Sequence, residues 1–247
     1  MSTSNHHEVI VVGTGPGGAT AARRMAQKGR DVLILEKAEL PRHKACGGGL
    51  TGNVAQHLDF DASETIENSI SSTHFVFRGG QVLELNPAGL KVDMVHRNKF
   101  DYLLTQKAVE AGAILKEKTP LKRIRSENGK KIIETPNGEF TADIIIGADG
   151  AASTTARAVG LRKNAPFGTA IDADLEPPEE VYEEWKDKAI FDFGIIPHGY
   201  GWSFPKGKLF SVGVGTTNRK FKDGRQHLET LMARYPCLQN PVSIVER

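Results

Sequence analysis

The feature that most constrains this chain is a glycine-rich turn near its start, Gly13-Thr-Gly15-Pro-Gly-Gly18. An apolar run, Val9 to Val12, precedes the turn, and Glu36 closes the next apolar run. Such glycines permit a tight turn, let backbone approach a pyrophosphate and let the helix pack on the strand, while the helix N-terminus faces the phosphate charge. A carboxylate after the second strand can bind an adenosine ribose. Because strand, helix and acid are all present, we prefer a dinucleotide site to a chance glycine turn.

Composition is that of an ordinary globular chain. The 247 residues are 39% hydrophobic and 25% charged, which is enough for one large or two modest domains. The net charge of +2 does not indicate the strongly basic surface that binds nucleic acid, so we expect no nucleic-acid partner. The sequence shows neither a membrane-spanning apolar run nor a signal peptide. Cys46 and Cys237 are too few for a disulfide scaffold and have no metal-ligand spacing, so we expect a cytoplasmic protein without metal.

The apolar pattern predicts a complete βαβ unit at the start of the chain. Val9 to Val12 and Val32 to Leu35 are continuous apolar runs, typical of parallel strands buried on both faces. A helix is expected from Gly17 to Lys28, stopped by Gly29. Its inner face carries Ala19, Ala22, Met25 and Ala26.

A second helix follows later in the chain. Asn98 marks its N-cap, Asp101 lies in its first turn, and Gly112 ends it. A strand resumes over residues 113–116. The pattern then predicts an antiparallel meander, whose hairpins fall at Asn128-Gly129 and Asn137-Gly138.

The meander leads into Asp143 to Gly147, which we interpret as a buried strand, and then into Asp149-Gly150. Ligands bind at the carboxyl ends of strands in an open α/β sheet, so Asp149 is a candidate cofactor contact. The alternative is that Asp149 only caps the helix that follows it. Read together with the glycine turn, Asp149 favours the cofactor role.

Beyond residue 161 the helix-strand alternation ends, and segments such as Phe191 to Ile196 and Leu209 to Val214 alternate with period two. We expect Phe191, Phe193 and Ile195 to share one face. The pattern predicts a second, largely antiparallel sheet.

The segment Arg42-His-Lys-Ala-Cys46-Gly-Gly-Gly-Leu50 carries three consecutive glycines. They favour either a mobile loop or a backbone that lies against a flat ligand. Their N–H groups can form an anion-binding concavity, and a thiol beside it, with Arg42 and Lys44 nearby, can be activated. The alternative is a mobile loop with an inert cysteine.

A third segment of interest is His198-Gly-Tyr200-Gly-Trp202-Ser-Phe204-Pro-Lys206. In a strand, Tyr200, Trp202 and Phe204 project from one face and form an aromatic wall. Periodicity alone favours the reading that these rings are simply core.

Five segments stand in order along the chain: Gly13-x-Gly15-x-x-Gly18, Cys46-Gly-Gly-Gly-Leu50, Arg97-x-x-Phe100-Asp101, Asp149-Gly150 and Tyr200-x-Trp202-x-Phe204-Pro205-Lys206. Together they resemble the geranylgeranyl reductase family of flavoproteins, which has the FAD fold of aromatic hydroxylases such as p-hydroxybenzoate hydroxylase. The first, third and fourth segments are shared across that whole class. The second and fifth are far more restricted and select the family.

The resemblance implies an α/β fold of two parts. The first is a Rossmann-like FAD-binding domain, residues 1–73 and 97–160, with a mostly parallel sheet and an antiparallel meander. The second is a substrate-side domain, residues 74–96 and 161–247, with a largely antiparallel sheet.

The resemblance also implies roles for individual residues. Residues of the glycine turn cradle the FAD pyrophosphate, Glu36 holds the adenosine ribose, and further residues contact the cofactor. The implied cofactor residues are Gly13, Gly15, Pro16, Gly17, Gly18, Glu36, Lys37, Cys46, Gly47, Gly49, Arg97, Leu121 (through its backbone), Asp149 and Gly150. Tyr200, Trp202 and Phe204 become the lining of a lipid pocket, and Cys46 and Tyr200 are the candidate catalytic side chains.

One departure from the family pattern stands out. Family members carry a third FAD motif, a Gly-Asp followed by small residues, beyond the aromatic segment, and this sequence reaches Arg247 without one. We therefore expect a piece of a longer protein, in preference to a shortened protein with a damaged site.

The functional hypothesis is reduction of carbon–carbon double bonds in an isoprenoid chain, with NAD(P)H or reduced ferredoxin as electron donor. An isoprenoid or lipid substrate permits peripheral contact with the inner face of a membrane. One rival is an FAD-dependent aromatic monooxygenase or halogenase. Another is a truncated, non-catalytic nucleotide-binding or interaction protein.

Overall fold

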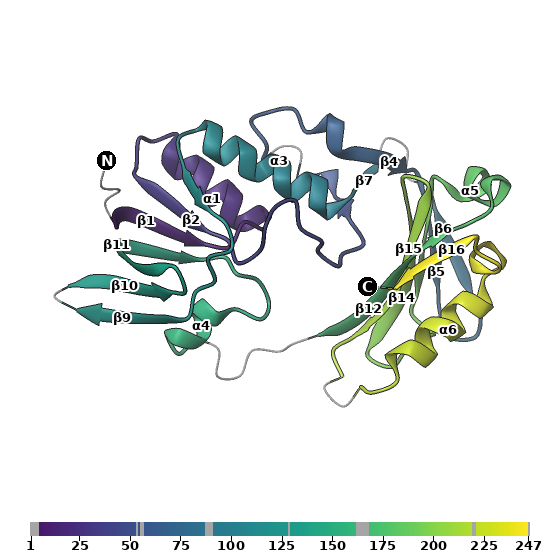
Figure 1. Cartoon of the computed structure of the whole chain (residues 1–247). Coiled ribbons are helices and arrows are strands. Elements are labelled where there is room, and N and C mark those ends of the chain that lie inside the picture. The colour runs from purple at the N-terminus through teal and green to yellow at the C-terminus, as the bar shows by residue number, and fades with distance from the viewer. Residues whose placement is uncertain are drawn as a thin grey trace. The chain divides into compact units, whose positions relative to one another are not determined.

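The computed structural model describes residues 5–52, 54, 57–86, 91–127, 129–161, 168–218 and 221–246. The chain divides into two compact units (Figure 1). The first unit comprises Met1–His43 and Asn98–Ala165, and the second comprises Lys44–Arg97 and Pro166–Arg247. Residues 44–73, which we expected in the first domain, therefore lie with the second unit. The reason is strand pairing, because this segment contributes two strands to a small sheet built with residues 92–95.

The first unit contains a six-stranded sheet in the order β8-β2-β1-β11-β10-β9. The pairs from β8 to β11 are parallel, and the pairs among β11, β10 and β9 are antiparallel. This is the mixed sheet that the sequence predicts. The strands are β1 (His6–Val12), β2 (Val32–Leu35), β8 (Ile114–Lys116), β9 (Arg123–Glu127), β10 (Lys130–Thr135) and β11 (Gly138–Gly147). The helices are α1 (Pro16–Ala26), α3 (Arg97–Glu110) and α4 (Thr154–Ala158).

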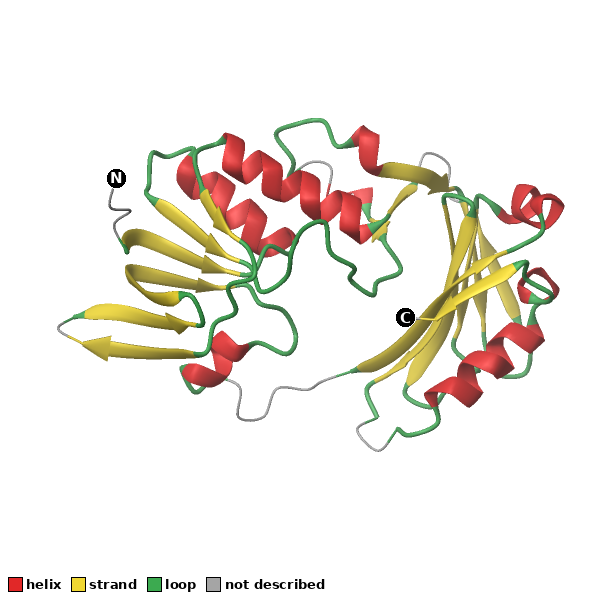
Figure 2. Ribbon diagram, in the orientation of Figure 1, coloured by secondary structure: helices red, strands yellow, loops and turns green. Residues whose placement is uncertain are grey.

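Helices α1 and α3 lie side by side on one face of this sheet (Figure 2). A hydrogen bond from Arg23 Nη1 to the Lys107 carbonyl, 2.8 Å long, joins the two helices. The inner face of α1 is the predicted one, with its three alanines buried and Met25 packed against the same core. Helix α1 ends two residues before the predicted Lys28, and Gly29, with φ +74°, donates from its N–H to the Ala26 carbonyl.

Two details of the meander differ from expectation. The strand over residues 143–147 is not buried, since 53% of the surface of Ile144 is exposed and its neighbours are only partly covered. Among the described residues, no element fully covers this part of β11. Its apolar run is therefore not buried on both faces. The hairpin between β10 and β11 has Pro136 and Asn137 as its turn, because Thr135 pairs with Gly138. Asn128 of the other predicted hairpin lies outside the described residues.

The second unit contains a seven-stranded sheet in the order β16-β12-β15-β14-β13-β5-β6, and a three-stranded sheet in the order β3-β7-β4. The large sheet is antiparallel except for the parallel pair β13 and β5. Its strands are β5 (Ser72–Val76), β6 (Val82–Leu85), β12 (Thr169–Glu176), β13 (Lys188–Asp192), β14 (Gly199–Lys206), β15 (Leu209–Thr216) and β16 (Ser243–Glu246). The small sheet has β3 (Gly49–Leu50), β4 (Ile66–Ile70) and β7 (Val92–Val95). The helical segments are η1 (Ser63–Thr65), α5 (Glu179–Trp185), α6 (Gly224–Arg234) and η2 (Pro236–Leu238).

One face of the large sheet packs against α6 and forms the main core of the second unit. Ile195 belongs to this core, so the expectation that it shares a face with Phe191 and Phe193 was wrong. Strand β13 ends at Asp192, and the period-two alternation stops there. The chain then turns and carries Ile195 to the other side of the sheet.

Within the described part of the chain, no helix is both long and apolar enough to cross a membrane. Those residues also contain no cluster of three or more His, Cys, Asp or Glu side chains arranged to hold a metal ion.

Candidate functional site

Two glycines of the N-terminal turn are required by packing. Gly13 has φ +97°, and a Cβ there would lie 2.7 Å from the Ala148 carbonyl oxygen. A Cβ on Gly18 would lie only 1.9 Å from the Gly13 carbonyl oxygen. A side chain at either position would therefore push α1 or β11 away from the turn.

The other two glycines of the turn leave space instead. Gly15 is the N-cap of α1, and Pro16 follows as its first residue. A Cβ on Gly17 would meet nothing within 4 Å. The N-terminal N–H groups of a helix have no partner within the helix and carry a positive partial charge, so this open cradle fits the phosphates of a dinucleotide.

Glu36 lies directly beside the turn and is 2% exposed. Its Oε2 accepts hydrogen bonds from the N–H and hydroxyl of Thr14, at 3.0 and 2.9 Å, and its Oε1 accepts one from the Ala38 N–H at 3.0 Å. Burial alone would raise the pKa of Glu36, but these hydrogen bonds and the nearby Arg42 charge outweigh it, so the pKa lies below its ordinary value. A carboxylate has about four acceptor positions, which leaves one on Oε1 for a ligand hydroxyl.

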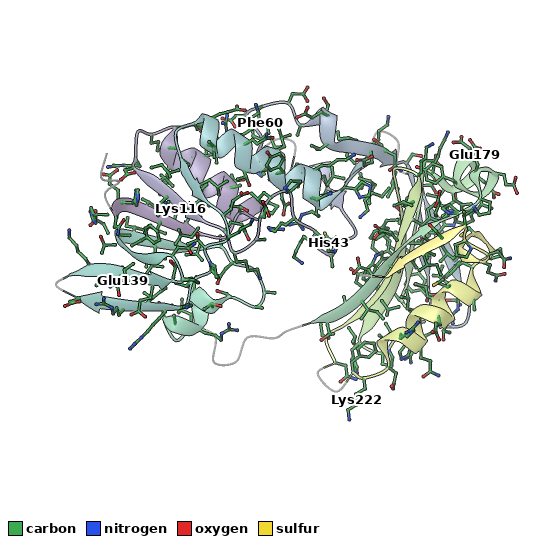
Figure 3. All side chains as sticks on the ribbon, viewed as in Figure 1. His43, Phe60, Lys116, Glu139, Glu179 and Lys222 are labelled. Atoms are coloured by element: carbon green, nitrogen blue, oxygen red, sulfur yellow. The ribbon has the colours of Figure 1, made fainter. Side chains whose placement is uncertain are left out.

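Arg42 also belongs to the site around the glycine turn, although the sequence alone does not place it there. Its Nη2 lies 3.3 Å from Asp101 Oδ2, and its Nε lies 3.7 Å from Glu36 Oε2. The same Nη2 lies 3.9 Å from where a Gly15 Cβ would be. Its Nη1 is buried and has no hydrogen-bond partner among the described residues. A buried unpartnered donor is costly, so this one fits an anionic or hydroxylated ligand at the turn. The adjacent His43 is labelled in Figure 3.

Ser153 is the N-cap of α4, and its hydroxyl accepts a hydrogen bond from the Ala156 N–H, while Asp149 lies four residues before it. Asp149 accepts hydrogen bonds from the Ser153 hydroxyl and from the N–H groups of Thr154 and Thr155. Burial would raise its pKa, but these bonds lower it below the ordinary value. Asp149 is thus not the N-cap itself, but it binds the N-cap hydroxyl and the first two N–H groups of α4, and its role toward a cofactor is a proposal. Gly147, which the sequence did not single out, makes room for Thr155, whose Cγ2 would be 2.6 Å from a Cβ at that glycine.

The remaining predicted cofactor residues have varied surroundings. Lys37 is exposed, and Gly150, with φ +79°, is also exposed. The Leu121 side chain packs into the core of the first unit, which leaves its backbone for any contact. Arg97 is the first residue of α3 and is half-buried.

Seven aromatic rings form a continuous layer on the second face of the large sheet. Neighbouring ring centroids lie between 4.9 and 6.3 Å apart. Phe191 pairs across the sheet with Trp202 and with Phe75, which places these strands' rings on one face. The aromatic layer consists of Phe75, Phe77, Phe191, Phe193, Tyr200, Trp202 and Phe204. Phe77, Phe193 and Tyr200 are each about two-fifths exposed, so the layer is not a closed core.

Glycines of β15 make room for Trp202. A Cβ on Gly213 would lie 2.2 Å from the indole Cζ2, and one on Gly215 would lie 3.5 Å from Cζ3. The indole therefore lies flat across β15. Its Nε1 is buried without a hydrogen-bond partner among the described residues, which marks a second unused donor.

The loop that contains Cys46 is held against the aromatic layer. A Cβ on Gly47 would lie 2.6 Å from the Phe204 ring, so only glycine fits there. Gly48 has φ +87°, and its carbonyl accepts a hydrogen bond from the Val95 N–H at 3.0 Å. Cys46 itself is half-buried.

Comparison with known proteins identifies the class first. Residues 6–176 match the model of the FAD binding domain. The glycine turn, Glu36 and the mixed sheet all lie within the matched segment.

Two curated relatives and one solved structure are similar to most of this chain. A digeranylgeranylglycerophospholipid reductase of Thermoplasma acidophilum is 33% identical, covering 94% of this chain and 63% of the relative. A geranylgeranyl diphosphate reductase of Rhodobacter capsulatus is 33% identical, covering 85% of this chain and 54% of the relative. A geranylgeranyl bacteriochlorophyll reductase-like structure from Thermoplasma acidophilum has a TM-score of 0.83 and 28% identity, covering 99% of this chain and 66% of that one.

The chain belongs to the family that carries this FAD binding domain, and the names of these relatives agree with the geranylgeranyl reductase resemblance of the five sequence segments. It spans between 54% and 63% of the length of these two curated relatives.

Proposed function

We propose that the protein reduces carbon–carbon double bonds of an isoprenoid chain with FAD as its cofactor. The observation that carries the proposal is the aromatic layer, a broad apolar surface with exposed rings. Most of the binding energy of an isoprenoid tail is non-directional apolar burial, which such a surface provides. The two reductases above are named for geranylgeranyl-bearing compounds, which supports this choice of substrate class.

The first unit would bind the adenosine and pyrophosphate part of FAD. The open cradle at Gly15 and Gly17 suits the pyrophosphate, and the free acceptor position on Glu36 suits a ribose hydroxyl. The unpartnered Nη1 of Arg42 adds a positive charge at the same turn. Binding of FAD is thus supported by the family model and by two groups of this site that can bind a ligand, the acceptor position on Glu36 and the Nη1 donor of Arg42.

Saturation of a double bond adds a hydride to one carbon and a proton to the other. Bound FAD in its reduced form supplies the hydride chemistry. The chain must supply a proton, hold the alkene still and keep water away. We assign the proton to Cys46 or Tyr200, because both carry an exchangeable hydrogen at the aromatic layer or at the loop packed against it.

The substrate proposal is tested by incubating the reduced, FAD-loaded protein with geranylgeranyl diphosphate and with a geranylgeranylated glycerolipid. A mass increase of two hydrogens for each saturated double bond is expected for at least one of them. Oxygen uptake coupled to NAD(P)H oxidation and an oxygenated or halogenated aromatic product would instead select the monooxygenase or halogenase alternative. No flavin uptake would select the non-catalytic alternative.

The two proton-donor assignments are tested with Cys46→Ala and Tyr200→Phe. We expect one of them to lower the rate of saturation by about a hundredfold or more, in line with loss of a general acid. Tyr102→Phe, on α3 of the other unit, is the matched control and should keep the full rate. Full rates in both test variants would overturn the assignments.

The electron donor and the place of action complete the proposal. We propose NAD(P)H or reduced ferredoxin as donor, and contact with the inner face of a membrane as a peripheral cytoplasmic protein. Flavin reduction followed by absorbance with each donor, and co-sedimentation with lipid vesicles, test these two points.

A further inference from the structure

Lys206 is a buried lysine, with 4% of its surface exposed. It is the last residue of β14, the strand that carries Tyr200, Trp202 and Phe204. Its Nζ donates a hydrogen bond to the Cys46 carbonyl oxygen at 3.1 Å. Burying an ammonium group is costly unless the fold provides partners for it. The fold keeps this charge inside, and one of its partners is the backbone of the cysteine loop.

The position of Lys206 follows from the alternation of β14. Residues 200, 202, 204 and 206 project from the same face of the strand, so the lysine is the next side chain along the row of rings. Gly47 rests on Phe204, and Lys206 reaches Cys46 one residue earlier. The same strand therefore carries three rings of the aromatic layer and the anchor of the loop.

Other contacts of the loop come from a different sheet. The Gly48 carbonyl accepts from Val95, and Gly49 pairs with Met94, both in β7. These contacts fix the end of the loop, whereas Lys206 fixes its start at the residue that bears the thiol.

We propose that Lys206 is a positioning residue that holds Cys46 in one conformation against the aromatic layer. The significance of that position rests on the proposed function, but the contact itself does not. Small displacements of a reacting group are costly to catalysis, so an anchor at the cysteine backbone gives the thiol a defined place.

The test follows the labelling of Cys46 by N-ethylmaleimide in the full chain without flavin, resolved by peptide mass. Cys237, the second cysteine, is buried, and burial raises its pKa to about 12, so its slow labelling reports that the fold is intact. Lys206→Met removes the donor but keeps an apolar stem. Lys206→Gln keeps a neutral donor, and Lys206→Arg keeps a charged one. Lys208→Met, at an exposed position in the following turn, is the control.

We expect Lys206→Met to label Cys46 about tenfold faster than the wild type, because a charge-assisted hydrogen bond no longer restrains the loop. Lys206→Arg should return the rate to within about threefold of the wild type, and Lys208→Met should leave it unchanged. Equal rates for Lys206→Met and the wild type, with Cys237 still protected, would overturn the proposal.

If Lys206→Met exposes Cys237 and so unfolds, Lys206→Gln decides. Glutamine is shorter than lysine and its amide is uncharged, so it can give only a weaker hydrogen bond to the Cys46 carbonyl. A folded Gln variant with faster Cys46 labelling therefore supports the proposal, and one with wild-type labelling shows that the charge-assisted bond does not restrain the loop and contradicts it. Because no flavin or substrate is involved, failure here is distinct from failure to reduce an isoprenoid.

Discussion

The guanidinium of Arg42 lies 3.3 Å from the carboxylate of Asp101, whose side chain is only 1% exposed. This pair joins the loop after β2 to α3. The helix begins at Arg97, so Asn98 lies inside it and Asp101 lies past its first turn, where the sequence predicts an N-cap and a first-turn acid. The arginine is thereby held beside the glycine turn by the protein itself, before any ligand arrives. Such preorganisation lowers the entropic cost of binding.

Asp101→Asn should destabilise the first unit. Removing the Asp101 charge leaves the largely buried Arg42 with only its longer, 3.7 Å approach to Glu36, and we expect a loss of about 3 kcal/mol in the free energy of unfolding, measured by urea denaturation. Glu110→Gln, which breaks an exposed pair with Lys107 on the same helix, is the control and should cost less than about 0.5 kcal/mol. Equal stability of the two variants would refute the structural role of the Arg42 pair.

The glycines of the N-terminal turn should separate folding from cofactor binding. Gly18→Ala places a Cβ 1.9 Å from a backbone oxygen and should cost about 1–3 kcal/mol of stability. Gly17→Ala meets no atom and should change stability by no more than about 1 kcal/mol in the favourable direction.

In the same pair of variants, FAD titration followed by flavin fluorescence gives the second readout. Gly17→Ala should weaken FAD binding about tenfold, or about 1.4 kcal/mol, because its methyl group takes space in the cradle. Unchanged FAD affinity in a folded Gly17→Ala protein would place the phosphates elsewhere.

Glu36 should make stability depend on pH in the acid range. Its pKa in the folded protein lies below the ordinary value of 4.5, since its hydrogen bonds outweigh the effect of burial. The ionised group therefore stabilises the fold above that value, and this contribution is lost as the pH falls through the folded pKa. Urea unfolding should show Glu36→Gln less stable than the wild type at neutral pH, with the difference shrinking between about pH 5 and pH 3. A constant difference across that range would contradict the assignment.

Gly213→Ala should disturb Trp202 directly. The new Cβ would lie 2.2 Å from the indole, so we expect a loss of about 1–3 kcal/mol and a shifted emission maximum, read in a Trp185→Phe background. Adding Trp202→Leu should recover part of the loss, with a coupling energy of about 1 kcal/mol or more in the double-mutant cycle. Strict additivity would mean that the two positions do not share this space.

Local patterns in the sequence were sufficient for much of the fold. Strand β2 has the predicted bounds, Val32 to Leu35, because a continuous apolar run marks a buried strand. Gly29 stops α1 as predicted, because glycine readily adopts the positive φ that the chain has there. The alternation of Tyr200, Trp202 and Phe204 placed these rings on one face, since a strand has a period of two. Each of these features depends on neighbours in the chain.

The features that escaped prediction depend on residues far apart in the chain. No residue near Arg42 in the sequence indicates that it will pair with Asp101. The position of Asp101 in the sequence predicts only an acidic residue near the start of a helix. In the sequence Lys206 is only the last residue of the aromatic motif, because its contact with Cys46 joins a strand to a loop 160 residues away. Ile195 was misplaced because the end of β13 is set by the turn that follows it.

Each unit is assembled from two separate stretches of chain, and this has a consequence for the order of folding. The first unit needs β11 between β1 and β10, and that strand is synthesised only after residues 44–97 have already emerged. Strand β5 of the second unit must wait still longer for its parallel partner β13. A chain growing on the ribosome should therefore complete the first unit while β5 is still without that partner, which exposes that stretch to chaperones and proteases during synthesis.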